Sequence, residues 1–141
     1  PGVFIYRFNS PLTYFNATYF KRRLLERFAR QNQLETVECV IIDAVPCFTH
    51  LDLSVMAMLT DIDVLLRKRG VSLVLAGRKR QLISWFEQTD MVSGEEGITI
   101  RSDLYLALKM QQSHVAACEA QQLDDSHSDD STETVLTHSQ I

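Results

Sequence analysis

An apolar run that ends in an aspartate and leads through a short loop into an amphipathic helix most constrains the fold of this chain. Residues 37–43 are almost continuously apolar, which is typical of a strand covered on both faces of a sheet. After the loop, residues 53–69 place apolar side chains at helical spacing, and Gly70 is suited to end that helix. A further apolar run follows at 71–76. The order strand, helix, strand predicts parallel pairing with a right-handed crossover.

Strand and helix patterns also alternate along the rest of the first 112 residues. The alternation of apolar and polar side chains near the amino terminus predicts a strand, and Asn16 is a good N-cap for the helix that follows. Ser102 or Asp103 is expected to cap the last helix. The pattern therefore predicts an α/β fold with a mostly parallel sheet. Its further elements are strands at 3–8 and 98–100, and helices at 16–31, 79–88 and about 103–112.

Composition divides the chain into a folded part and an acidic tail. With 45% hydrophobic and 23% charged residues, the 141-residue chain is ordinary globular material for one domain, without an 18-residue apolar span. From residue 111 onward there are six acidic residues and no lysine or arginine. We expect a domain over 1–112 and a disordered tail over 113–141, because the tail lacks the apolar surface that would offset ordering entropy.

The cysteines and the amino terminus indicate a reducing compartment. Cys39, Cys47 and Cys118 are odd in number and have no C-x-x-C spacing, so we expect three reduced thiols. No secretory signal pattern is present at the start. The first residue is Pro1 rather than methionine, as expected for a fragment of a longer protein.

The loop before the second helix carries a family resemblance. It reads Leu51-Asp-Leu-Ser-Val55. This resembles the signature of the STAS domain, which reads apolar-Asp-Ser/Thr-Ser/Thr-Gly and is shared by bacterial anti-sigma-factor antagonists and the cytoplasmic tails of SulP anion permeases. The resemblance implies a small, mostly parallel sheet of four or five strands, with four helices packed mainly on one side.

The amino-terminal block resembles the permease branch of that family. It carries Pro11-Leu12, Phe15-Asn-Ala17 and Tyr19-Phe20 ahead of and within the first helix. The resemblance implies a non-catalytic, cytoplasmic regulatory and dimerisation domain of a bicarbonate or sulfate transporter. Its partners would be an upstream transmembrane domain of the same polypeptide and a second copy, on the cytoplasmic side of the plasma (inner) membrane.

Asp52 and Ser54 are the site residues of the signature loop, and each has two readings. Either is a plausible N-cap that accepts free backbone N–H groups, and for Ser54 a structural capping role is preferred over phosphorylation. In the anti-sigma antagonists a hydroxyl on this loop is phosphorylated, so the alternative is a free-standing antagonist switched at Ser54. Leu53 and Val55 replace small residues of the family, and we expect Val55 to obstruct a kinase. This favours the transporter.

Basic residues of the first helix form a second candidate site. Lys21, Arg22, Arg23 and Arg27 are expected on the face opposite the apolar stripe, together with Arg30. The simpler reading is a solvated face; the functional reading is contact with an anionic membrane surface or with loops of the transporter. Nucleic acid is not expected, because no aromatic residues interleave with these charges and the chain is acidic.

The remaining motifs give no active site. Arg78-Lys-Arg80 after Gly77 could hold a phosphate at a helix start, but the segment is no phosphate-binding loop, and nucleotide binding is not expected. His50 and Asp52 are too few for a metal site, and no arrangement for nucleophilic catalysis can be argued from spacing. We therefore expect no metal, no cofactor and no enzymatic activity.

Overall fold

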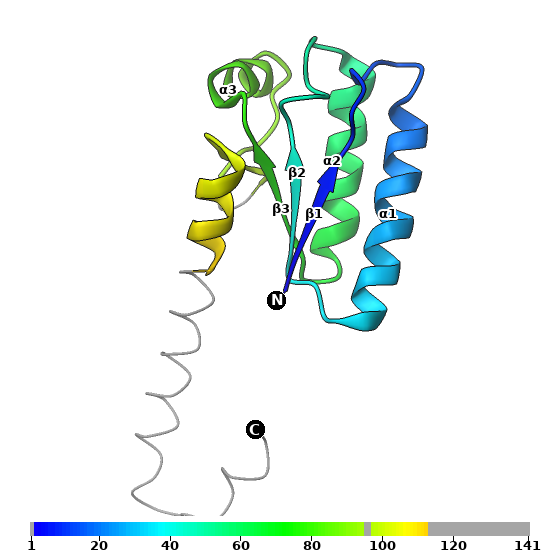
Figure 1. Ribbon diagram of the computed structural model, residues 1–141. Helices are drawn as coiled ribbons and strands as arrows, with labels where there is room; N and C mark the ends of the chain where they lie inside the picture. Colours follow the sequence, from blue (N-terminus) through cyan, green and yellow to red (C-terminus); the bar gives the residue numbers. More distant parts are fainter. Residues whose placement is uncertain (1, 95–96, 113–141) are drawn as a thin grey trace, which may run out of the picture. The chain divides into compact units, whose positions relative to one another are not determined.

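The computed structural model describes residues 2–94 and 97–112 (Figure 1). Two units are distinguished, Pro1–Leu108 and Lys109–Ile141. The predicted tail and Cys118 lie outside the described residues. The elements of the first unit are β1 (Val3–Arg7), α1 (Ala17–Leu34), β2 (Cys39–Asp43), α2 (Leu53–Arg67), β3 (Ser72–Ala76), α3 (Lys79–Gln88) and β4 (Thr99–Arg101), and a last helix begins at residue 104 and is described to 112.

The four strands form one parallel sheet in the order β1-β2-β3-β4. Ile5 pairs with Ile41, and Ile41 pairs with Val74 in the next strand. Each crossover between neighbouring strands contains one helix, as the sequence pattern predicts. The parallel α/β fold is confirmed. Its consequence for function is that the loops leaving β1, β2 and β3 lie at the same edge of the sheet.

Helices α1, α2 and α3 cover one face of the sheet, and the last helix contributes to the other. The larger core combines Phe20 and Phe28 of α1, Leu59 of α2 and Phe86 of α3 with one side of the strands. The smaller core joins the other side of the strands to Ala107 of the last helix. The expectation of four helices packed mainly on one side is therefore confirmed (Figure 1).

The helix ends differ from the sequence prediction in physically simple ways. Helix α1 continues to Leu34 instead of ending near residue 31. The side chain of Asn16 makes no capping hydrogen bond. Instead its Oδ1 accepts the N–H of Thr13 at 2.8 Å, and its Nδ2 donates to the carbonyl of Pro11 at 2.8 Å. The amide is therefore used to fold the preceding loop rather than to cap the helix.

The end of α2, the start of the last helix and the bounds of β4 can also be compared with the sequence prediction. Gly70 has φ +73, and the N–H of Val71 donates to the carbonyl of Leu66 at 2.9 Å, the closing bond of a Schellman turn. Asp103 caps the last helix, since its Oδ1 accepts the N–H of Leu106 at 2.8 Å. The predicted strand at 98–100 is shifted by one residue, to Thr99–Arg101.

Candidate functional site

The carboxylate of Asp52 joins two loops at the edge of the sheet. Its Oδ1 accepts the N–H groups of Ser54 at 2.8 Å and Val55 at 3.2 Å, which caps helix α2. Its Oδ2 accepts the N–H of Tyr14, 38 residues away, at 2.9 Å. One side chain thus satisfies two free donors at the helix start and one donor of the loop after β1. Asp52 therefore links the signature loop to the amino-terminal block.

Ser54 lies inside the first turn of α2, so the expectation that its side chain caps the helix is wrong, whereas Asp52, the other plausible cap, does cap it. A capping side chain must belong to the residue before the helix, and that residue is Asp52. Ser54 is exposed, and its neighbour Leu53 is 71% exposed. Val55 is 1% exposed. That side chain is directed into the core. Obstruction of a kinase at this loop stays a prediction.

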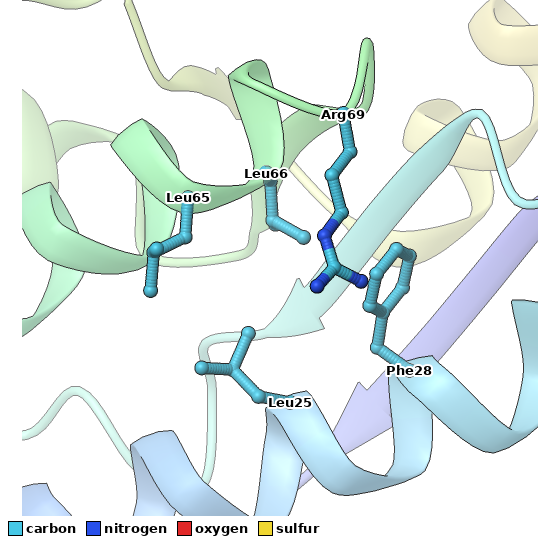
Figure 2. A pocket seen from close by; sticks show the side chains of 5 residues that line it. All are labelled: Leu25, Phe28, Leu65, Leu66 and Arg69. Atoms are coloured by element: carbon cyan, nitrogen blue, oxygen red, sulfur yellow. The ribbon is translucent and has the colours of Figure 1, made fainter.

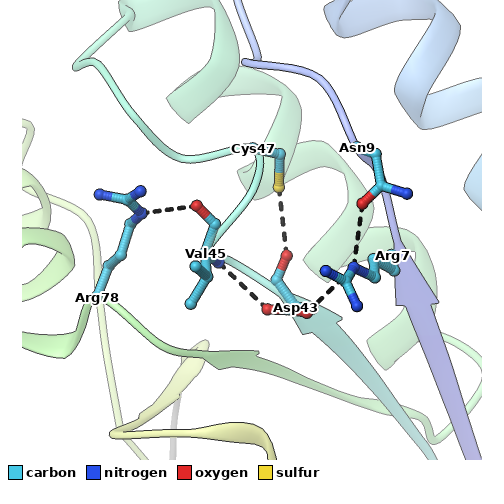
Figure 3. A network of polar contacts seen from close by, with 6 residues as sticks. All are labelled: Arg7, Asn9, Asp43, Val45, Cys47 and Arg78. Atoms are coloured by element: carbon cyan, nitrogen blue, oxygen red, sulfur yellow. Dashed lines mark hydrogen bonds and ion pairs between the residues drawn. The ribbon is translucent and has the colours of Figure 1, made fainter.

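A polar network lies at the carboxyl ends of β1 and β2 (Figure 3). Asp43, at the end of β2, accepts the N–H of Val45 at 3.2 Å and lies 3.7 Å from Arg7 Nε. Arg7 Nε also donates to Asn9 Oδ1 at 3.0 Å. The side chain of Arg7 is 65% exposed and that of Asp43 is 14% exposed. The pair stabilises little by itself, because an exposed cation is screened by water.

The buried thiol of Cys47 also contacts this network. Its Sγ donates to the carbonyl of Asp43 at 3.4 Å. Burial raises the pKa of Cys47 to about 12, and the nearby Asp43 carboxylate acts in the same direction. Burial likewise raises the pKa of Cys39. Both cysteines are buried free thiols. Neither has the lowered pKa of a reactive cysteine.

Gly77 and Arg78 form a left-handed turn before α3. Their φ angles are +99 and +51. Arg78 Nε donates to the carbonyl of Val45 at 2.9 Å, so this guanidinium holds the loop after β2 (Figure 3). Its Nη1 also lies 3.5 Å from Gln81 Oε1. Of the three bases considered for phosphate binding, Arg78 is thus already engaged with protein groups.

The basic residues of α1 do not share one face, which corrects the sequence prediction. Lys21 Nζ lies 3.7 Å from Asp61 Oδ2 on α2. The guanidinium of Arg22 lies over the ring of Tyr19, 5.7 Å from its centroid. Burial raises the pKa of Tyr6, while the positive charges of Arg27 and Arg23 oppose that rise. Lys21 therefore faces α2, while Arg22 lies on the exposed side of α1.

Two shallow hollows lie beside helix α2. The first, of about 100 Å³, is between α1 and α2, and Arg69 closes it by lying 5.9 Å from the ring centroid of Phe28 (Figure 2). The second, of about 220 Å³, is lined mainly by apolar side chains between α2 and the segment after α3. Both are too small for a typical ligand pocket. Their lining residues are Leu25, Phe28, Leu65, Leu66 and Arg69 in the first, and Leu53, Met56, Ala57, Thr60, Thr89 and Met91 in the second.

Neither a metal centre nor a membrane span is found in the described part of the chain. Over residues 2–94 and 97–112, no three side chains of the metal-binding types gather into a site. His50 Nδ1 lies 2.9 Å from the hydroxyl of its neighbour Thr49. Within the same residues no helix is both long enough and apolar enough to cross a bilayer.

A family model for the STAS domain matches residues 1–107 of the chain. The chain belongs to the STAS family. The match covers the whole sheet, the helices α1 to α3 and the Asp52 loop, and the predicted STAS family is confirmed. No curated protein matches the sequence. STAS domains are generally regulatory rather than catalytic modules.

Sequence reasoning missed the two contacts that organise this STAS domain edge. The bond between Tyr14 and Asp52 and the bond between Arg78 and Val45 each join neighbouring strand–helix loops. A usable signal was present, because each pair of loops follows neighbouring parallel strands and must therefore meet at one edge.

Proposed function

We propose that this STAS domain is the cytoplasmic regulatory and dimerisation domain of a SulP-type anion transporter carrying bicarbonate or sulfate. The observation that carries the proposal is the block from Pro11 to Phe20, which resembles the permease branch of the family. In this reading the domain performs no catalysis. It associates with an upstream transmembrane domain and with a second copy of itself at the cytoplasmic side of the membrane.

The fold supports a role in which that block is presented to other protein or membrane surfaces. Leu12 is 1% exposed and Phe20 is fully buried, so both ends of the block are anchored in the core. Between them Tyr14 and Phe15 are exposed. The block is thus anchored at both ends and exposes two aromatic side chains between them. The hydrogen bond from the Tyr14 N–H to Asp52 connects it to the signature loop.

Anion uptake tests the proposal. The complete reading frame is expressed in cells, and uptake of labelled sulfate and bicarbonate is compared with that of a version lacking residues 1–112. The proposal expects membrane-associated protein and at least a tenfold loss of uptake without the domain. A protein that begins at this domain and stays out of the membrane fraction would contradict it.

The second function is a free-standing anti-sigma-factor antagonist switched at Ser54. The observation that favours it is the exposure of Ser54 in the first turn of α2, where the positive end of the helix dipole favours a phosphate. Incubation with an anti-sigma-factor kinase and ATP, followed by mass spectrometry, separates the two. Stoichiometric phosphate on Ser54 supports the antagonist, and its absence supports the transporter.

A further inference from the structure

Three apolar side chains project at the edge of the sheet, two from the loop after β1 and one from the first residue of α2. Phe15 is 92% exposed, Tyr14 is 68% exposed, and Leu53 of the signature loop is 71% exposed. The rings of Tyr14 and Phe15 pack edge to face with centroids 5.5 Å apart. The bond between the Tyr14 N–H and Asp52 brings their two loops together. We call these three residues the aromatic tip.

The aromatic tip stands on a loop that is held in place by hydrogen bonds. Leu12 N–H donates to the carbonyl of Cys47 at 2.8 Å, and Asn16 bonds the backbone at Thr13 and Pro11. The N–H of Phe15 donates to Thr13 Oγ1 at 3.3 Å. A held loop keeps its apolar side chains exposed instead of letting them fold back onto the domain.

Phe15 also occupies a position from which an apolar side chain normally packs onto its own helix. It precedes the N-cap residue Asn16, and the usual packing partner for that position is the fourth helical residue, here Phe20. Phe20 instead packs against Tyr6 and Phe8, with ring centroids 5.3 Å apart in both cases. Because the core already surrounds Phe20, Phe15 stays in solvent.

Positive charge follows the aromatic tip directly. Helix α1 contains five basic residues and one acidic residue, Glu26. Arg22 is exposed and lies over the ring of Tyr19, which is itself 48% exposed. Arg23 is half-buried on the adjacent flank. A few exposed aromatic side chains beside exposed arginines are what a protein needs to sit at the boundary of an anionic bilayer.

We propose that the aromatic tip and the first two turns of α1 form a docking surface for an anionic lipid bilayer. Phe15 and Tyr14 would enter the headgroup region, while Arg22 and Arg23 would contact lipid phosphates. The inference rests on the proposed function for the nearness of a membrane. Lipid is favoured over protein because exposed arginine lies directly beside the exposed rings, which is the charge complement of anionic headgroups.

Vesicle co-sedimentation of the 141-residue chain tests this surface. Vesicles of phosphatidylcholine with 30% phosphatidylglycerol should bind the protein, and pure phosphatidylcholine should bind it at least tenfold more weakly, since each arginine near the surface contributes about 1 kcal/mol. Tyr14→Ser with Phe15→Ser should reduce binding at least tenfold. Arg22→Glu with Arg23→Glu should abolish the preference for anionic vesicles. Leu34→Ser is the matched control, because Leu34 is 83% exposed in the last turn of the same helix.

A second readout reports insertion rather than binding alone. The indole introduced by Phe15→Trp should be quenched by brominated acyl chains, whereas Trp85, which is 7% exposed in the protein, should not. Equal vesicle binding by the aromatic-tip variant and by Leu34→Ser would overturn the proposal. A loss of self-association in the aromatic-tip variant without any vesicle binding would also overturn it, in favour of a protein interface.

The same variants separate this inference from the proposed function. If vesicle binding fails while anion uptake still requires the domain, the lipid surface is overturned and the transporter role stands. If the vesicles bind the domain while the full-length protein is not a transporter, the transporter role is overturned and the lipid surface stands. Circular dichroism of each variant checks that these substitutions leave the fold intact.

Discussion

Asp52 Oδ2 accepts the backbone N–H of Tyr14 at 2.9 Å, while Asp52 Oδ1 caps helix α2. The signature loop of this STAS domain is therefore tied to the segment that precedes α1. The start of α2 and the backbone of Tyr14 are thus connected through a single side chain, and its contribution to stability can be measured.

Asp52→Ala should lower the free energy of unfolding by about 1–2 kcal/mol, because it removes the cap of α2 and leaves the N–H of Tyr14 without its acceptor. Asp52→Asn should lose less, since the amide oxygen can still cap the helix. Urea unfolding followed by circular dichroism measures both. Asp61→Ala is the matched control, because it removes only the partly exposed pair with Lys21. An Asp52→Ala loss no larger than that control would contradict the linking role.

Ser54→Ala should change stability by less than about 0.5 kcal/mol, because the serine is exposed within α2 and alanine favours a helix. This small change contrasts with the loss of stability expected for Asp52→Ala. Urea unfolding of Ser54→Ala beside Asp52→Ala should show a clear difference between them. A loss of about 1 kcal/mol at Ser54 would restore the serine as a cap.

Gly77→Ala should destabilise the domain by about 1–3 kcal/mol. A Cβ at Gly77 would lie 2.6 Å from Cγ2 of Val45, and the residue has φ +99. Gly70→Ala is the control, since Gly70 has φ +73 but open space around its added Cβ. Thermal unfolding of both variants separates steric contact from backbone strain. The outcome that contradicts this account is an equal loss in the two variants.

The buried thiol of Cys47 should make stability fall at high pH. Its pKa rises from 9.0 to about 12 on folding, so the unfolded chain releases this proton first. The stabilising contribution is complete below pH 9 and is lost progressively between pH 9 and 12. Above pH 9 the slope approaches about 1.4 kcal/mol per pH unit.

Cys47→Ala tests that dependence. Urea unfolding of both proteins from pH 8 to 10.5 should give a steeper decline for the wild type, because only the wild type carries the Cys47 proton. Parallel curves would show that this thiol ionises equally in both states. The other cysteines are present in both proteins, so their effect cancels in the comparison.

The amino-acid sequence by itself determined the parallel α/β fold and the family. Continuous apolar runs at β2 and β3, separated by a helix ending at Gly70, leave few alternatives to a right-handed crossover in a buried sheet. These signals are local: each depends on spacing within a strand or a helix. The same local reasoning named both Asp52 and Ser54 as possible caps but could not decide between them, since either side chain suits a helix start.

Only the tertiary structure decided how the strand–helix loops are joined. Asn16 would cap α1 in isolation, yet its side chain is used to fold the loop at Pro11 and Thr13. The second oxygen of Asp52 and the guanidinium of Arg78 each bond a backbone group more than 30 residues away. Such choices depend on which donors the parallel register brings within 3 Å, and helix or turn propensity contains no information about that distance.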